Sequence, residues 1–358
     1  MGEIIIEVKR KAEENSKAPV MMISATEGFI NQSERYSSNN AGKSLKKYTL
    51  LKKGELAYNH GYSKTRNFGS CFTLEIEQAR IPFVYHSFSL KGENDSVFWG
   101  KYLNSGLFDG KLRRLVASTA RMDGLLNISF ENYSSMPVNI PSLPEQKKIA
   151  AFFTLLDRRI QKQRQLVEFL KTYKRGVMNK LFDKNIEFNK YLKWEKVDEI
   201  FKTINDKPYQ VQSCSYFQNG LYDIVDQGKK EIVGFCDYND KLFIDVPVII
   251  YGDHTTLVKY REKKFIVGGD GVKLLKSRDS NINLKYLYYA LLRYNIKLEG
   301  YKRHFSILKE VSLPIFEKCI QDEIAKIITC IDSYIKLHEN KLSSLLSLKS
   351  SLLQKMFI

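Results

Sequence analysis

The sequence has few of the features that mark membrane, secreted or metal-binding proteins. No run of about 18 apolar residues occurs, so a membrane-spanning helix is not expected. The 5 cysteines include no Cys-x-x-Cys pair, which argues against a disulfide scaffold and a structural zinc site. Met1 to Arg10 lacks the basic region and long apolar core of a signal peptide. We therefore expect a cytoplasmic protein without disulfides.

Motifs for catalysis, metals and cofactors are also scarce. The glycine-rich stretch 268–271 lies between two strand-like runs instead of opening a helix, which favours a hairpin turn over a nucleotide site. The 5 histidines show no metal-ligand spacing. Asp253, Glu262 and Lys264 loosely fit the acidic pair and lysine of metal-dependent nucleases, which stays open as an alternative. We otherwise expect no catalytic residue, metal or cofactor in this chain.

What the sequence has in excess is positive charge. Lysine and arginine total 57 against 40 acidic residues, a net charge of +17. Such an excess favours a polyanionic partner, because every phosphate that is neutralised releases condensed counterions. Segment 143–183 is the most basic per residue, with 10 basic and 4 acidic side chains. The charge therefore favours nucleic acid as a partner.

An apolar ladder with steps of four and three occurs twice and predicts two long amphipathic helices. The first ladder consists of Ile149, Phe153, Leu156, Ile160, Gln163, Val167, Leu170, Lys174, Val177 and Leu181. The second consists of Ile324, Ile328, Ile331, Ile335, His338, Leu342, Leu345, Lys349, Leu352 and Met356. One ungapped shift of 175 residues superimposes the two ladders, including their polar interruptions. This coincidence predicts an internal repeat.

The two predicted helices need partners for their apolar stripes, and each is the obvious partner of the other. A parallel pair in register would place Lys174 opposite Lys349 in an apolar seam, where like charges are costly. An antiparallel pair sets each lysine against a different layer, where its stem can pack and its ammonium can reach water. The sequence therefore predicts an antiparallel coiled coil related by a pseudo-two-fold axis.

The segments before the helices share an order of elements. We predict strands at 54–58 and 246–251, then at 83–85 and 265–267, and helices at 101–103 and 285–287, with Lys101 aligned to Lys285. These mixed elements predict an α+β fold with two globules. The predicted organisation is a globule at 1–142, a long helix at 143–183, a second globule at 184–312 and a distal helix at 313–358.

The residues that open the helices resemble a known family. Leu143-Pro144-Glu145-Gln146-Lys147-Lys148-Ile149-Ala150, and Gln321 with Ile324-Ala325 in the second copy, are similar to the Pro-rich entry and Glu-Gln-x-x-Ile-Ala motif of type I restriction–modification specificity subunits. Trp194-Glu195-Lys196-Val197 resembles the family's entry into a target-recognition domain. The first globule lacks this tryptophan-containing lead, so we expect its start to be shortened.

The resemblance implies a non-catalytic reader of a bipartite DNA sequence. Each globule would act as a target-recognition domain for one half-site, while the helix pair sets their separation and docks the methylation subunits. The implied partners are double-stranded DNA, two methylation subunits and the restriction subunits. S-adenosylmethionine, magnesium and ATP would belong to those partner subunits.

Candidate DNA contacts come from polar loops that follow the equivalent strands. Lysines position DNA through phosphates, whereas arginine, asparagine, threonine and tyrosine can contact base edges. The candidates of the first globule are Tyr58, Asn59, His60, Tyr62, Lys64, Arg66 and Arg121; those of the second are Asp253, His254, Thr255, Thr256, Lys273 and Arg303. The remaining alternatives are a stand-alone nuclease and a coiled-coil scaffold with no role in nucleic-acid binding.

Overall fold

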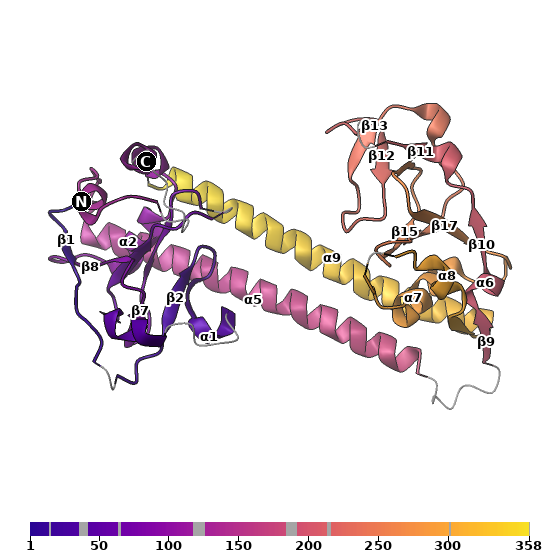
Figure 1. Cartoon of the computed structure of the whole chain (residues 1–358), viewed down its shortest axis with the longest axis horizontal. Coiled ribbons are helices and arrows are strands. Elements are labelled where there is room, and N and C mark those ends of the chain that lie inside the picture. The colour runs from indigo at the N-terminus through magenta and orange to yellow at the C-terminus, as the bar shows by residue number, and fades with distance from the viewer. Residues whose placement is uncertain are drawn as a thin grey trace. The chain divides into compact units, whose positions relative to one another are not determined.

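The computed structural model describes residues 1–13, 16–35, 42–63, 66–116, 126–183, 192–212, 216–300 and 302–357. They form two compact units, unit 1 (residues 1–164 and 340–358) and unit 2 (residues 165–339). The division falls within both long helices, α5 (Leu143–Leu181) and α9 (Lys318–Lys355), so each unit contains part of both (Figure 1). Among the described helices, none has the length and apolarity needed to cross a membrane.

Unit 1 contains an antiparallel sheet in the order β1-β8-β5-β6, together with the antiparallel pairs β2–β3 and β4–β7. Its strands are β1 (Ile5–Glu7), β2 (Met21–Ser24), β3 (Gly28–Asn31), β4 (Thr49–Lys52), β5 (Leu56–Asn59), β6 (Ser70–Thr73), β7 (Gln78–Ile81) and β8 (His86–Leu90). Its short helices are α1 (Gln32–Arg35), η1 (Gly42–Lys47), α2 (Ser96–Leu103), α3 (Asp109–Leu115) and α4 (Phe130–Ser134).

The predicted strand at 83–85 is wrong. These residues form the turn between β7 and β8, and the side chain of Phe83 is 53% exposed. The two flanking strands belong to different sheets, so the chain must change direction here. Pro82 precedes the turn and has no backbone N–H to donate to a strand neighbour.

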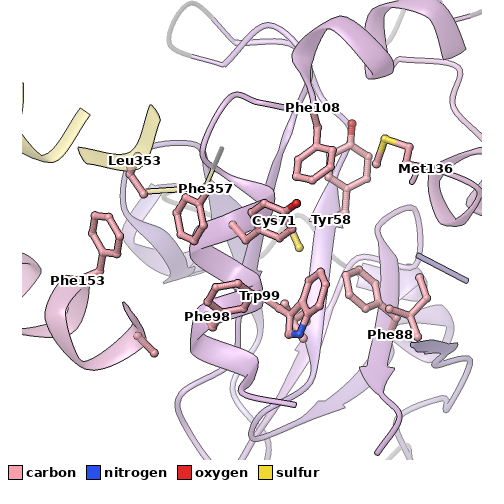
Figure 2. Close-up of a cluster of buried hydrophobic side chains, with 14 of the residues drawn as sticks. Tyr58, Cys71, Phe88, Phe98, Trp99, Phe108, Met136, Phe153, Leu353 and Phe357 are labelled. Atoms are coloured by element: carbon pink, nitrogen blue, oxygen red, sulfur yellow. The ribbon is translucent and has the colours of Figure 1, made fainter. Parts of the chain in front are cut away.

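The core of unit 1 joins the sheet, α2 and the two long helices. Phe98 and Trp99 of α2 are fully buried against the sheet residues Tyr58 and Phe88. Phe153 of α5 and the residues Leu353 and Phe357 close this core on its helical side (Figure 2). The Phe153 and Phe357 rings are stacked with centroids 5.8 Å apart.

Unit 2 contains an antiparallel sheet in the order β10-β17-β14-β15, a mixed sheet in the order β11-β16-β12-β13 and the pair β9–β18. Its strands are β9 (Lys193–Lys196), β10 (Phe201–Ile204), β11 (Gln210–Val211), β12 (Tyr222–Val225), β13 (Gly234–Cys236), β14 (Val248–Gly252), β15 (Val258–Arg261), β16 (Ile266–Gly268), β17 (Val272–Ser277) and β18 (Ser312–Ile315). Its short helices are α6 (Val197–Ile200), η3 (Lys207–Tyr209), η5 (Asn239–Lys241), α7 (Leu284–Tyr294) and α8 (Phe305–Lys309).

The structure shifts the start of the distal helix. Residues 313–315 were expected to open it but form β18, which pairs with β9, and α9 begins at Lys318. In the core of unit 2, Met178 of α5 and Phe182 pack in one cluster with Ile324 and Ile328 of α9 and with residues of α7. The apolar stripe of each helix is thus buried against the other helix inside each unit.

Contacts between the two helices show that they run antiparallel within each unit. Residue numbers rise along α5 as they fall along α9, from Phe153–Phe357 to Asp157–Lys349 in unit 1 and from Lys171–Glu339 to Lys174–Asp332 in unit 2. In unit 1, Asp157 pairs with Lys349 and with Lys101 of α2, each at 2.5 Å. In unit 2, Lys174 pairs with Asp332 at 2.6 Å. The shift of 175 residues converts the Asp157–Lys349 pair into the Asp332–Lys174 pair. The lysines were expected to reach water, but an aspartate of the facing helix holds each one.

Near the C-terminal end of each long helix, the buried residues no longer follow the predicted ladder. Most predicted seam residues are buried, and Ile331, Leu342 and Leu345 are half-buried. Further along, the buried residues are one position later than the ladder predicts: Met178, Phe182, Leu353 and Phe357 instead of Val177, Leu181, Leu352 and Met356. An α-helix has 3.6 residues per turn, so a seven-residue pattern drifts by about 20° per heptad.

One buried glutamine anchors the start of each long helix, Gln146 in α5 and Gln321 in α9. The Oε1 atom of Gln146 accepts from the backbone N–H of Asp95, the N-cap of α2, at 2.9 Å; that of Gln321 accepts from Asn283, the N-cap of α7, at 2.8 Å. Each Nε2 donates to the carbonyl oxygen five residues upstream, at 3.0 and 2.7 Å. The same side chain thus anchors a short helix to a long helix in both units.

The N-caps of α2 and α7 show that the predicted alignment of Lys101 with Lys285 is wrong. Because the two N-cap residues are equivalent, Lys101 corresponds to Tyr289 and not to Lys285. The Tyr289 hydroxyl donates to Asp332 at 3.0 Å, as the ammonium of Lys101 donates to the equivalent aspartate of α5. Loop insertions before the helices had hidden this four-residue difference in register.

The Asp157 ion pairs predict an acid-sensitive contribution to stability. Burial raises the pKa of its carboxyl, but the ammonium groups of Lys101 and Lys349 outweigh burial and hold this pKa below its ordinary value. The contribution is therefore present above the unfolded-state pKa of about 4 and is lost as pH falls through the folded-state value. Asp157→Asn should lower the stability of unit 1 by about 1 kcal/mol at neutral pH and flatten its decline in acid.

Hydrogen exchange of the α5 amides between pH 3 and 7 measures this effect. Glu145→Gln, which removes an exposed carboxylate from the same helix, is the matched control. An acid decline in Asp157→Asn as steep as in the parent chain would contradict the assignment.

Candidate nucleic-acid interface

The carboxyl ends of three strands of unit 2 gather at one edge. β12 and β16 are parallel neighbours, so the loops that follow them leave the sheet on the same side. These are loop 226–233 and turn 269–271. Turn 253–257, which follows β14, joins them through hydrogen bonds. We call this group of three loops the loop edge of unit 2.

Gln227 connects all three loops. Its side-chain Oε1 accepts from the backbone N–H of His254 at 3.0 Å, and its Nε2 donates to the carbonyl oxygen of Asp270 at 2.9 Å. Its own carbonyl accepts from the Thr255 hydroxyl at 2.6 Å. A Cβ at Gly271 would lie 2.6 Å from the Gln227 Nε2, and Gly271 has φ +81°, so only glycine fits there.

Asp253, a predicted DNA contact, is buried and ties its turn to α8. Its side chain is 4% exposed, and its Oδ1 accepts from the backbone N–H of Phe305 at the start of α8, at 2.8 Å. Its carbonyl oxygen accepts from the backbone N–H of His304, also at 2.8 Å. The carboxylate is therefore occupied inside the fold, which the polar character of the loop did not reveal.

The two threonines of the turn serve mainly to shape it. The hydroxyl of Thr255 is bound to the Gln227 carbonyl, and Thr256 is 8% exposed with its hydroxyl donating to the Thr255 carbonyl at 2.7 Å. Thr256 has φ 56°, a left-handed conformation that is rare for a β-branched residue. The Asn295 amide holds its carbonyl oxygen at 2.6 Å.

The remaining candidates of unit 2 lie on or beside the loop edge. His254 is half-buried at the turn, Lys273 is half-buried near the start of β17, and Arg303 is exposed just before His304. Lys229 and Lys230 of loop 226–233 are also exposed, and neither is among the candidates predicted from the sequence. The only sequence signal for them was the turn-like Asp-Gln-Gly before two lysines.

Two candidates of unit 1, Tyr58 and His60, are buried as well. Tyr58 is 2% exposed, donates its hydroxyl to the Phe68 carbonyl at 2.6 Å and stacks on Tyr133 with ring centroids 4.2 Å apart. His60 is 7% exposed, and its Nδ1 and Nε2 lie 2.6 and 2.8 Å from the carbonyl oxygens of Leu126 and Val84. Neither side chain is available to DNA in this conformation.

Tyr62 and Arg66 are the accessible candidates of unit 1. Tyr62 is 62% exposed, and Arg66 is half-buried beside a cleft of about 510 Å³. Burial lowers the pKa of the Arg66 guanidinium, and nearby Asp109 opposes that shift. Asn59 is half-buried, with its amide donating to the Ile23 carbonyl at 3.3 Å. Lys64 and Arg121 lie outside the described residues.

His60 and Asp253 occupy equivalent places in the two units. Each directly follows the strand that lies third in its antiparallel sheet, β5 in unit 1 and β14 in unit 2. The carbonyl oxygen of His60 accepts from Leu126 shortly before α4, as that of Asp253 accepts from His304 at the start of α8. Two of the residues that the sequence selected in these loops, His60 and Asp253, therefore tie each loop to the core.

The nuclease alternative is not supported by this arrangement. Asp253 precedes β15 and Glu262 follows it, and a four-residue strand separates them by about 13 Å. Glu262 and Lys264 are exposed, while the Asp253 carboxylate caps α8. Within the described part of the chain, no group of three His, Cys, Asp or Glu side chains is placed to hold a metal ion.

Comparison with known proteins identifies the second half of the chain. Residues 191–347 match the family model of the type I restriction modification DNA specificity domain. A protein of Methanocaldococcus jannaschii named as the specificity subunit of the type I restriction enzyme MjaX is 25% identical over 325 residues, covering 82% of this chain and 75% of that protein. The resemblance carried by the helix-opening motifs is therefore confirmed.

Two further comparisons agree. The EcoR124I/EcoR124II specificity subunit of Escherichia coli is 29% identical over 103 residues, which cover 28% of this chain and 26% of that subunit. The solved S subunit of a type I restriction–modification system from M. genitalium has a TM-score of 0.64 at 17% identity, covering 100% of this chain and 94% of that chain. The latter likeness concerns the fold.

The role of Asp253 can be tested by its amide analogue. Asp253→Ala removes the acceptor for the Phe305 N–H and should lower the stability of unit 2 by about 1–2 kcal/mol. Asp253→Asn keeps an acceptor oxygen and should retain most of that stability. Urea unfolding of both variants measures the difference. Equal destabilisation by the two substitutions would contradict the capping role.

Proposed function

We propose that this chain is a type I restriction–modification DNA specificity subunit that reads a bipartite DNA target with one half-site for each unit, since residues 191–347 match the model of that family's specificity domain. The observation that carries the proposal is the family match of the second half together with the recurrence of its elements in the first. The sheet order β1-β8-β5-β6 of unit 1 corresponds strand by strand to β10-β17-β14-β15 of unit 2.

We propose that the two halves are a pseudo-two-fold repeat and that α5 and α9 pair as an antiparallel coiled coil that sets the half-site spacing. The equivalent ion pairs Asp157–Lys349 and Asp332–Lys174 support this, as do the equivalent bonds of Gln146 and Gln321. A paired rod between two readers would convert half-site spacing into a geometric constraint.

The chemistry of the loops suits duplex DNA. The net charge of +17 supplies a sequence-independent attraction to phosphates. The exposed Tyr62 and Arg303 and the half-buried His254 carry groups that can contact base edges. Lysines near these loops would hold the backbone and fix the register of the reading residues.

Exposed apolar residues of the long helices are the proposed docking sites for methylation subunits. Phe152 and Leu155 are 43% and 65% exposed on the unit 1 part of α5; Ile327 and Tyr334 are 42% and 50% exposed on the unit 2 part of α9. Phe152 and Ile327 are related by the shift of 175 residues, which would suit two copies of one partner. Large exposed side chains in such numbers indicate interaction surfaces.

We further propose that the chain is non-catalytic and works in the cytoplasm. The methylation subunits, two in number, and the restriction subunits would carry S-adenosylmethionine, magnesium and ATP. Co-expression of the chain with its methylation subunits, followed by mapping of methylated positions in host DNA, tests the proposal. A two-part sequence with a fixed gap would support it, whereas absence of any sequence preference would overturn it.

The separate reading of two half-sites predicts reciprocal selectivity changes. Tyr62→Ala should alter base preference only in the half-site of unit 1, and His254→Ala only in the other. A lost base contact costs about 1–3 kcal/mol, so discrimination at that position should fall roughly 5- to 150-fold. Binding to duplexes substituted one base pair at a time measures this. A change in both half-sites from either substitution would contradict the division of labour.

The basic face of α5 predicts a sequence-independent contribution. Lys162 and Arg164 are exposed in unit 1, and their joint replacement by alanine should weaken binding to all duplexes equally. If both contact phosphates, the slope of log K against log salt should become shallower by about 2. Titrations at several salt concentrations measure the slope. Lys336→Ala/Lys341→Ala on α9 removes the same number of positive charges and is the control. If the chain were instead a coiled-coil scaffold, the unsubstituted chain would bind no DNA even at low salt.

A further inference from the structure

Loop 226–233 of unit 2 presents two adjacent lysines at the loop edge. Lys229 and Lys230 are exposed, while the strands on either side of the loop, β12 and β13, are paired with each other. The loop thus projects from a hairpin whose base is fixed.

A buried lysine holds this loop in place. Lys259 of β15 is 8% exposed, and its ammonium donates to the carbonyl oxygens of Asp226 at 2.8 Å and Lys230 at 2.6 Å. The Asp226 carboxylate lies 3.8 Å from the same ammonium and accepts from the Gly228 N–H at 2.8 Å. A buried ammonium is costly unless its protons are bound, so these bonds strongly favour one loop conformation.

Gln227 sits in the middle of that loop and fixes it to the two other loops of the edge. Its side-chain Oε1 and Nε2 are both bonded, to the His254 N–H and the Asp270 carbonyl, and its backbone carbonyl accepts from the Thr255 hydroxyl. Loss of this side chain would remove the bonds to His254 and Asp270 and leave only the backbone carbonyl of Gln227 joined to Thr255, so the lysine loop would be held less firmly against the turn that carries His254.

We propose that loop 226–233 is a DNA-backbone contact of unit 2, made by Lys229 and Lys230, and that Gln227 is the positioning residue that sets this contact against the base-reading turn 253–257. The inference rests on the proposed function. A phosphate contact beside a base contact fixes the register of the reader on the duplex, so an unlocked loop would cost selectivity as well as affinity.

The lysine contact is tested by the salt dependence of binding. The full chain is titrated with a duplex that carries the mapped target. Lys229→Ala/Lys230→Ala should make the slope of log K against log salt shallower by about 2. Lys263→Ala/Lys264→Ala is the matched control, because it removes two adjacent exposed lysines at the opposite end of β15. Equal slopes for the two double variants would overturn the proposal.

The positioning role is tested with Gln227→Met, which keeps the side-chain length and removes the two side-chain hydrogen bonds. Base discrimination at the unit 2 half-site should fall at least fivefold, with the unit 1 half-site unchanged. A merely unfolded fraction would lower the active concentration for both half-sites equally and leave each discrimination ratio intact. Unchanged discrimination would overturn the role of Gln227. Failure of the parent chain to prefer its mapped target would instead overturn the proposed function.

Discussion

The apolar stripe along each long helix is the constraint on which the structure depends. Such a stripe cannot stay in water over the length of α5 or α9, and in each unit the other helix covers part of it. The cover is specific because Asp157 and Asp332 each meet a lysine of the facing helix. Sliding one helix by a turn would separate both pairs and misplace the rings of Phe153 and Phe357.

Hydrogen bonds connect the long helices to the sheets and hold the loops that follow the strands. Gln146 and Gln321 connect each long helix to the cap of a short helix that packs on a sheet. The residue after the third strand of each sheet, His60 or Asp253, then ties its loop to the segment before α4 or α8. The exposed side chains between these ties are held by a fixed backbone, which keeps the entropic cost of ordering them on a partner low.

Much of the fold could be predicted from spacing alone. The helix bounds of α5, the seam from Ile149 to Leu170 and the antiparallel direction follow from where apolar and charged residues recur. The seam beyond Lys174 could not be predicted, because the drift of a 3.6-residue period accumulates with length. The α2–α7 alignment failed because loops of different length precede the two caps, and sequence order alone cannot register them.

For the candidate interface, the sequence determined which loops lie in equivalent places and that the chain is strongly basic, since both follow from composition and order. Only the tertiary structure decided which of their residues face solvent. A polar side chain after a strand can reach water or fill a hydrogen bond in the core, and Tyr58, His60 and Asp253 do the latter. Gln227 and Lys259 act through partners 27 to 43 residues away in sequence. Residues this far apart in sequence become neighbours only when the strands pair, so no local sequence pattern could predict these hydrogen bonds.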